Sequence, residues 1–214
     1  MTSAVLSNFS ASSPRPISAY LRVLVVALFA LVAMLPGCQN YDQLVTLDEA
    51  CNQKWSDYEA SLQRRADLIP NLVATVKGSA KFEEDTLTKV IEARASATQI
   101  KLTADDLTDP AKVEAFNKAQ DQLKGSLSRL MMTTENYPQL KASAQFQDLS
   151  KQIEGSENRL LRSREEYNKA VGSYNTELRK IRGSAVNKAT GKPFKERAYF
   201  KASEESKVAP KVTF

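Results

Sequence analysis

Residues 144–182 read AQFQDLSKQIEGSENRLLRSREEYNKAVGSYNTELRKIR, and this stretch decides the fold. Its apolar or small residues recur in steps of three and four, at Phe146, Leu149, Ile153, Ser156, Leu160, Ser163, Tyr167, Ala170, Tyr174, Leu178 and Ile181. That spacing places them on one face of an α-helix roughly 58 Å long. Gly183, after a run of basic residues, is expected to cap its C-terminal end. A stripe this narrow must be buried against other helices.

A second stretch with the same spacing begins at Thr108-Asp109-Pro110, which predicts an N-cap followed by Pro in the first helical position. The stretch is expected to stop at Asn136-Tyr137-Pro138. Its seam is formed by Val113, Phe116, Gln120, Leu123, Leu127 and Leu130. These features predict a second long helix.

The first stretch along the chain is expected to start at Thr46-Leu47-Asp48-Glu49, which has the spacing of a capping box. Its seam comprises Cys51, Trp55, Tyr58, Leu62, Ala66, Ile69, Val73, Val76, Ala80, Leu87, Val90 and Ala97. Pro70 should kink the helix because it removes a hydrogen bond to Ala66. The pattern does not decide between one kinked helix and two helices broken near Gly78.

Short loops near residues 101–109 and 137–142 make neighbouring helices antiparallel. We therefore expect an all-α fold, a long antiparallel up-and-down bundle of three or four helices with coiled-coil-like seams, over residues 46–182. Residues 183–214 form a basic tail that should be extended, and partly disordered past Lys201.

The N-terminal segment, residues 1–37, is expected to target the chain to a membrane. An apolar run from Val23 to Leu35 spans only about 20 Å, less than the roughly 30 Å of a bilayer core, which is typical of a signal peptide. Leu35-Pro36-Gly37-Cys38 resembles a bacterial lipobox, although Pro36 is unusual at its position. Cys38 would then carry lipid and residues 38–45 would form a tether. The alternative is an uncleaved, single-pass inner-membrane helix beginning near Ile17.

Both alternatives place the rest of the chain outside the cytoplasm, because Arg22 precedes the apolar run. Gln39 after the cysteine favours the outer membrane over retention at the inner one. The expected location is therefore the periplasmic side of a bacterial cell envelope.

Composition excludes several kinds of site. The chain has no His, and its two cysteines, Cys38 and Cys51, cannot form a thiolate cluster, so we expect neither cofactor nor metal. After residue 37 there are 28 basic and 25 acidic residues, interspersed along the helices, which does not favour nucleic acid as a partner. No catalytic motif is recognisable, and an enzyme is not expected.

Three segments are similar to the signature of the LemA family of bacterial envelope proteins. They are residues 63–78, QRRADLIPNLVATVKG, residues 135–142, ENYPQLKA, and the third segment with Glu154-Gly155, Glu157-Asn158-Arg159, Arg164, Tyr167-Asn168 and Tyr174-Asn175. The resemblance covers about residues 41–181. It implies a helical bundle tethered by an N-terminal membrane segment, and it implies no reaction.

The polar residues of these segments are candidates for a binding site or for an inter-helix network. Arg64, Arg65, Asp67 and Asn71 could grip an anionic headgroup, a glycan or a partner carboxylate. The alternative is a network that fixes helix register by pairing with Glu157 or Arg164. Asn158 and Arg164 are candidate members of either arrangement.

Tyr167-Asn168 and Tyr174-Asn175 are seven residues apart and therefore share one helix face. Such a ladder could bind sugars of peptidoglycan, or serve as core tyrosines with pairing asparagines. The expected function is a scaffold or adaptor that contacts other envelope proteins. The alternative is a peptidoglycan- or lipid-binding module, and the sequence leaves the oligomeric state open.

Overall fold

A computed structural model describes residues 17–78, 83–180, 187–188 and 194–201. Within the first helix, side chains are described at positions 24–25 and from residue 41 onward. The elements are α1 (Ile17–Lys77), α2 (Glu84–Gln99), the short 3-10 helix η1 (Asp106–Thr108), α3 (Pro110–Thr134), α4 (Pro138–Lys141) and α5 (Ala144–Arg179). The described residues contain no strand, which confirms the all-α prediction.

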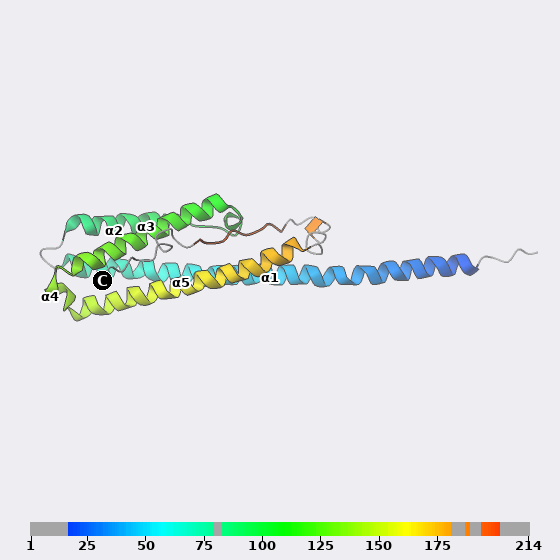
Figure 1. Ribbon diagram of the computed structural model, residues 1–214, viewed down its shortest axis with the longest axis horizontal. Helices are drawn as coiled ribbons and strands as arrows, with labels where there is room; N and C mark the ends of the chain where they lie inside the picture. The colour runs from blue at the N-terminus through cyan, green and yellow to red at the C-terminus, as the bar shows by residue number, and fades with distance from the viewer. Residues whose placement is uncertain (1–16, 79–82, 181–186, 189–193, 202–214) are drawn as a thin grey trace, which may run out of the picture.

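The four long helices form two pairs. Helix α1 packs along α5, and α2 packs along α3, while α4 turns the chain from one pair into the other (Figure 1). Helix α1 continues well past the bundle on its N-terminal side (Figure 1). Within the described residues, no helix carries an apolar stretch of the length needed to cross a membrane.

The predicted start of the first helix at Thr46 is wrong. Thr46 lies inside α1, and its hydroxyl donates to the carbonyl oxygen of Asp42 at 2.7 Å. This bond to the residue one turn earlier forms when threonine occupies a helix interior, where there is no free N–H group to cap. The four-residue capping pattern at Thr46 therefore does not mark the start of a helix.

Helix α1 continues through Pro70, and the proline gives α2 an attachment point. Because proline has no N–H group, the carbonyl of Ala66 one turn earlier loses its partner within the helix. Arg94 of α2 supplies the replacement, with its Nε donating to the Ala66 carbonyl at 2.8 Å. The chain then breaks near Gly78, so the first periodic stretch forms two helices, α1 and α2.

The boundaries of α3 agree with the sequence. Asp109 caps its N-terminus by accepting from the backbone N–H of Ala111 at 2.9 Å, and Pro110 occupies the first helical turn. All six predicted seam residues of α3 are buried.

Helix α5 starts after Ser143, whose side chain accepts from the N–H of Phe146 at 3.4 Å. It ends at Arg179 with Lys180 as the C-cap, earlier than expected. Extended backbone at Lys180, with ψ of 150°, stops the helix before the predicted cap. Ile181 and Gly183 lie outside the described residues.

Two hydrophobic cores follow each other along the bundle. The aromatic core, nearest the N-terminal extension of α1, comprises Leu44, Cys51, Trp55, Tyr58, Leu102, Leu107, Val113, Phe116, Leu160, Tyr167, Val171, Tyr174, Leu178 and Phe200. The aliphatic core, at the α4 end, comprises Ile69, Leu72, Val73, Val76, Leu87, Val90, Ala97, Leu123, Leu127, Leu130, Leu140, Phe146, Leu149 and Ile153. Most predicted seam residues lie in one of these cores.

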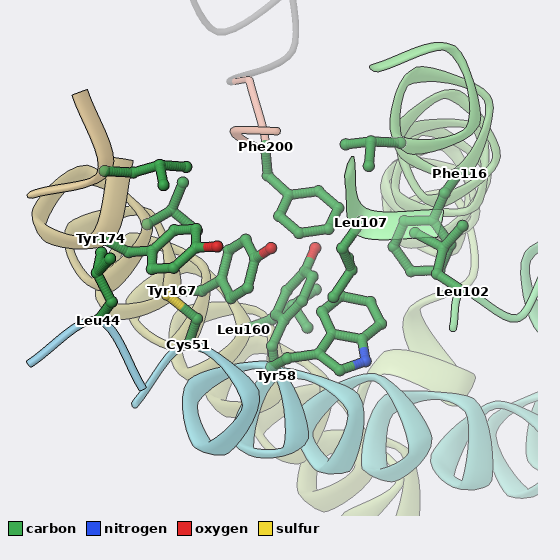
Figure 2. Packing of buried hydrophobic residues seen from close by; sticks show 14 residues of the cluster. Leu44, Cys51, Tyr58, Leu102, Leu107, Phe116, Leu160, Tyr167, Tyr174 and Phe200 are labelled. Carbon is green, nitrogen blue, oxygen red and sulfur yellow. The ribbon is translucent and has the colours of Figure 1, made fainter. Parts of the chain in front are cut away.

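Part of the expected tail belongs to the aromatic core. Residues 194–201, here called the strap, are extended, and Phe200 projects from them into the middle of the cluster (Figure 2). The ring of Phe200 stacks on Trp55, with centroids 5.5 Å apart and planes 7° apart. It also contacts the rings of Tyr58, Phe116 and Tyr167 at 5.1–5.9 Å. The strap is therefore a structural element of the bundle.

Candidate functional site

A chain of polar contacts crosses the bundle between the two cores, and we call it the polar layer. Arg65 of α1 donates from Nη1 to Glu157 of α5 at 2.9 Å and from Nη2 to the side-chain oxygen of Gln120 on α3. Gln120 in turn donates to the carbonyl of Ala97 near the end of α2 at 3.0 Å. The polar layer thus connects all four long helices.

Burial of Arg65 makes the polar layer specific for one register of the helices. The side chain of Arg65 is 2% exposed, and its Nε is buried without a hydrogen-bond partner. A guanidinium removed from water is tolerated only where its partners are in place, so the layer selects one register of the helices. The carboxylate of Glu157, at 26% exposure, reaches solvent on the α3 and α5 side.

On that side the polar layer opens into a hollow of about 470 Å³ between α3 and α5. Arg65, Asn158 and Arg164 line it together, so the structure unites three candidate residues from two helices. Tyr58 forms part of its wall, and burial raises the pKa of that phenol to about 12, opposed by the nearby charges of Arg164 and Arg65.

A second hollow, of about 670 Å³, continues along the same two helices toward α4. The two hollows share Lys124 and Glu157, and together we call them the α3–α5 cleft. Apolar side chains line the second hollow, with lysines and glutamates around them. Its lining includes Leu127, Met131, Phe146, Ile153, Lys141, Lys151, Glu135 and Glu154.

The cleft is open because α3 and α5 belong to different helix pairs. They face each other across the bundle, whereas each packs most closely on its own partner. Leu161, which lines the first hollow, keeps 46% of its surface exposed, and Met131 is only half-buried in the second. Exposed apolar side chains that line an open hollow are typical of an interaction site.

The arginine-rich segment of α1 divides between inside and outside. Arg65 points into the bundle, whereas Arg64, Asp67 and Asn71 are exposed. These three residues share an open hollow of about 650 Å³ with Arg159 of α5. Asp67 accepts a hydrogen bond from the side chain of Gln63 at 2.7 Å. The sequence candidates therefore form two separate surfaces.

The tyrosine and asparagine ladder on α5 holds the strap. Asn168 donates to the carbonyl of Phe200 at 2.8 Å and accepts from its N–H at 3.0 Å. Asn175 makes the same pair of bonds with Arg197, at 2.9 and 3.0 Å. Each amide thus satisfies both backbone groups of one strap residue. Neither asparagine is exposed.

The two tyrosines of the ladder are buried among the same contacts. The hydroxyl of Tyr174 donates to the carbonyl of Lys195 at 3.0 Å, and burial raises the pKa of Tyr174 above its usual value. Burial also raises the pKa of Tyr167 to about 12, and the Tyr167 hydroxyl is buried without a hydrogen-bond partner. The ladder is accordingly covered by the strap and is not an open sugar-binding surface.

Arg197 is the most important residue that the sequence analysis did not single out. Its guanidinium is buried and donates to Asp48 of α1 at 2.8 and 3.1 Å and to Asn52 at 2.7 Å. It also lies 5.8 Å from the ring centre of Tyr174. The only signal available in the sequence was the seven-residue repeat of the asparagines, which indicates paired ligands without naming what they bind.

The predicted lipidation residue, Cys38, lies in the part of α1 whose side chains are not described. Its role remains a prediction from the lipobox-like sequence.

The family model described as the LemA family matches residues 54–214. Two curated proteins of Paramagnetospirillum magneticum, Magnetosome protein MamQ 2 and Magnetosome protein MamQ 1, are each 26% identical to this chain over 201 residues. Each alignment covers 86% of this chain and 72% of the relative.

Proposed function

The chain belongs to the LemA family, whose members are membrane-associated envelope proteins, and we propose that it is a membrane-tethered scaffold that binds a protein partner in the α3–α5 cleft. The family description and the names of the two relatives specify no reaction.

The observation that carries the proposal is the shape and chemistry of the cleft. Its lining extends on α5 from Phe146 to Glu165, which corresponds to roughly 29 Å or five helical turns. An apolar floor with charged edges between two helices is the geometry in which an amphipathic helix binds. The two hollows, about 670 and 470 Å³, are large enough for its anchor side chains.

Charge at the cleft favours a partner helix with charges of both signs. The edge carries three lysines and three glutamates, namely Lys124, Lys141, Lys151, Glu135, Glu154 and Glu157. A partner that carries charges of only one sign is repelled at some positions of such an edge. The edge therefore favours a specific partner over a general polyanion.

A crosslinking experiment with matched positions tests the cleft. A photo-reactive residue replaces Gln147, which lines the cleft, or Gln152, which is exposed on the same helix but does not line it. Irradiation of intact membranes should give a discrete protein adduct from position 147 and not from position 152. Met131→Lys, which places a charge on the cleft floor, should abolish the adduct, whereas Met132→Lys at the neighbouring exposed position should leave it.

The pattern of the four measurements decides the result. Equal adducts from positions 147 and 152, or an adduct that survives Met131→Lys, would exclude the cleft as the docking site. Circular dichroism of each variant checks that the bundle remains helical.

The tether is a second part of the proposal. We expect lipid on Cys38 and the bundle on the periplasmic side of the outer membrane, on the strength of the lipobox-like residues 35–38. Cys38→Ser should then abolish incorporation of a labelled fatty acid and release the protein from the membrane fraction. Full-length Cys38→Ser protein that stays in the membrane would instead support the single-pass inner-membrane alternative.

The exposed hollow on α1 and α5 supports a second candidate, binding of an anionic envelope polymer or lipid headgroup. Arg64 and Arg159 approach one concave surface from two helices, and guanidinium groups suit phosphate and carboxylate. Co-sedimentation with isolated peptidoglycan and with vesicles containing anionic lipid tests it. Arg64→Gln with Arg159→Gln should lower the bound fraction, and unchanged binding would remove this candidate.

A further inference from the structure

The strap ends at the entrance to the α3–α5 cleft. Phe200, one residue before the end of the strap, contacts the rings of Tyr58 and Phe116 at 5.2 and 5.9 Å. Tyr58 also forms part of the wall of the first hollow, and Asn117, the residue after Phe116, lines the same hollow. Residues 202–214 therefore follow from a point beside this hollow.

The direction of the strap leads along the cleft. Asn175 of α5 holds Arg197 of the strap. Asn168, two turns earlier on α5, holds Phe200, so the strap runs antiparallel to α5. Helix α5 begins at the α4 end of the bundle, and its residues 146–165 line the cleft (Figure 1). A chain that continues in the direction of the strap consequently enters the first hollow and then the second.

The segment after the strap is long enough to fill the cleft. Along the axis of α5, the lining of the first hollow lies about 5–17 Å from Asn168, and the lining of the second extends to about 33 Å. The 14 residues after Phe200 span up to about 46 Å when extended. Residues 202–214 therefore reach the far end of the second hollow with several residues in reserve.

The first charges after the strap match two cations of the first hollow. In an extended chain, Glu204 and Glu205 lie about 13–17 Å past Phe200, level with this hollow. The hollow contains Lys124 of α3 and Arg164 of α5, and Arg164 forms no ion pair within the part of the chain that the structure describes. Two carboxylates at this level would meet one cation on each side of the cleft.

The acids of the cleft restrict the register in which this segment can bind. Asp121 and Glu165 line the first hollow and repel a carboxylate placed next to them. Lys207 lies about 23 Å past Phe200 in an extended chain, level with Glu154 in the second hollow. The favoured register therefore has the two glutamates beside the cations of the first hollow and the first lysine beside Glu154.

The apolar part of the segment coincides with the apolar floor of the second hollow. Residues 208–210, Val-Ala-Pro, lie about 26–33 Å past Phe200 in an extended chain. Phe146, at the far end of the floor, lies at the same level. Contacts here would cover apolar surface that the described residues leave open, including that of the half-buried Met131.

We propose that residues 202–214 bind in the α3–α5 cleft of their own chain, so that a partner must displace them. The docked strap holds the start of the segment at the entrance, which gives an effective concentration of roughly millimolar. Individually weak contacts are then sufficient for the cleft to be occupied. Binding of the segment depends only on the cleft itself, whereas its displacement by a partner rests on the proposed function.

Crosslinking within the purified full-length protein tests this binding. A photo-reactive residue replaces Val208, and light and isotopically heavy copies are mixed before irradiation. We expect crosslinks to the residues of α3 and α5 that line the second hollow, joining peptides with the same isotopic label. A photo-reactive residue at Tyr199, whose hydroxyl lies near Gly172, should crosslink to α5 near that glycine and shows in each variant that the strap is docked.

Two sets of substitutions make the test specific. Met131→Lys should lower the crosslink yield at least about fivefold, because it places a charge on the apolar floor. Met132→Lys, at the exposed next position, is the control and should leave the yield unchanged. Glu204→Lys with Glu205→Lys should lower the yield about threefold, since exposed charge pairs contribute little each. Arg164→Glu in the same chain should restore the yield.

Three outcomes would overturn the binding of the segment. They are crosslinks to surfaces outside the cleft, crosslinks between light and heavy chains, and a yield that neither Met131→Lys nor the charge reversal lowers. Because the charge reversal leaves the cleft floor unchanged, failure of the Met131 variant to fold would not prevent a decision.

A chain that ends at Lys201 separates this proposal from partner docking. It keeps the strap and should raise the partner adduct from position 147 several-fold in membranes. An unchanged adduct would overturn displacement by the partner. Absence of any partner adduct from the shortened chain would contradict the proposed function, while crosslinks from position 208 to the cleft would still support binding of the segment.

Discussion

The two ends of the bundle differ in the kind of segment that completes their cores. At the α4 end, the aliphatic core consists of helix seams whose side chains follow a regular period. At the other end, the aromatic core is closed by Phe200 from the extended strap and fastened by Arg197 to α1. The polar layer of Arg65, Gln120 and Glu157 separates the two.

One end of the bundle is therefore held together by its own helices, and the other by a segment distant along the chain. The aliphatic core contains residues of the helices alone. The aromatic core also requires the strap to dock in one register, at the end where the proposed membrane tether begins. The strap end is therefore the part of the molecule that can open locally while the rest stays folded.

Removal of the strap's anchor should have the largest effect. Phe200→Ala should lower the free energy of unfolding by roughly 3–5 kcal/mol, because a fully enclosed aromatic ring is replaced by a cavity. Urea unfolding followed by circular dichroism and by the fluorescence of Trp55, the only tryptophan, measures it. Tyr199→Ala, at the exposed neighbouring position, is the control. A Phe200 variant no less stable than this control would contradict the packing.

The aliphatic core should show a somewhat smaller loss that leaves the other end unchanged. Leu123→Ala should cost about 3 kcal/mol, since Leu123 is 1% exposed in the aliphatic core. The emission of Trp55 in the native state should not change, because Trp55 belongs to the aromatic core. Lys124→Ala, at the exposed next residue, is the matched control. A changed native spectrum would show that the two cores are not independent.

Substitutions at two neighbouring arginines, the buried Arg65 and the exposed Arg64, should have different effects. Arg65→Ala should cost about 2 kcal/mol, below the usual range for a broken buried pair because Glu157 reaches solvent. Arg65→Met should cost less, since its apolar chain refills the space. Arg64→Ala should change the unfolding midpoint little, because Arg64 is exposed. Equal effects at positions 64 and 65 would contradict the assignment of Arg65 to the interior.

A rise in pH to just above 9 should have the smallest effect, a slight weakening of the aromatic core. Burial raises the pKa of Cys51 from 9.0 to about 11 and the pKa values of Tyr58 and Tyr167 from 10.0 to about 12. Above pH 9 the unfolded chain releases these protons while the folded chain keeps them, so stability falls as pH rises. The fluorescence of Trp55 should respond before the helical signal does.

Tyr167→Phe provides the control for that pH dependence. The Tyr167 hydroxyl is buried without a partner, so its removal should not cost stability at neutral pH. It should reduce the slope of stability against pH above 10. An unchanged slope would mean that Tyr167 does not contribute to the alkaline loss.

The aliphatic end could be predicted from the sequence because burial there follows helical period. The predicted seam residues Leu123, Leu127 and Leu149 are all buried in the aliphatic core. The capping-box reading at Thr46 failed because the same residue types also occur within a continuous helix, where threonine bonds to the preceding turn. Local patterns thus identify helix faces better than helix boundaries.

The strap could not be placed from the sequence because an extended segment has no period of its own. Its position depends on Asn168 and Asn175 meeting Phe200 and Arg197, pairs that are distant along the chain. Asp48 likewise gains its partner only when Arg197 arrives. The candidate polar residues were recognisable by type, whereas their division between the cleft, the exposed hollow and the contacts to the strap required the three-dimensional arrangement.

The continuity of α1 fixes the orientation of the bundle about the axis of this helix. The helix runs without interruption from residue 17 through Leu44 into both cores. The rotation of the bundle about the axis of α1 is therefore fixed relative to the N-terminal end of that helix. Each residue added before Leu44 would rotate the α3–α5 cleft by about 100° around the helix axis and lift it by 1.5 Å. Seven added residues complete nearly two full turns and restore the original aim at a greater height. The length of α1 before Leu44 therefore determines the direction in which the cleft faces.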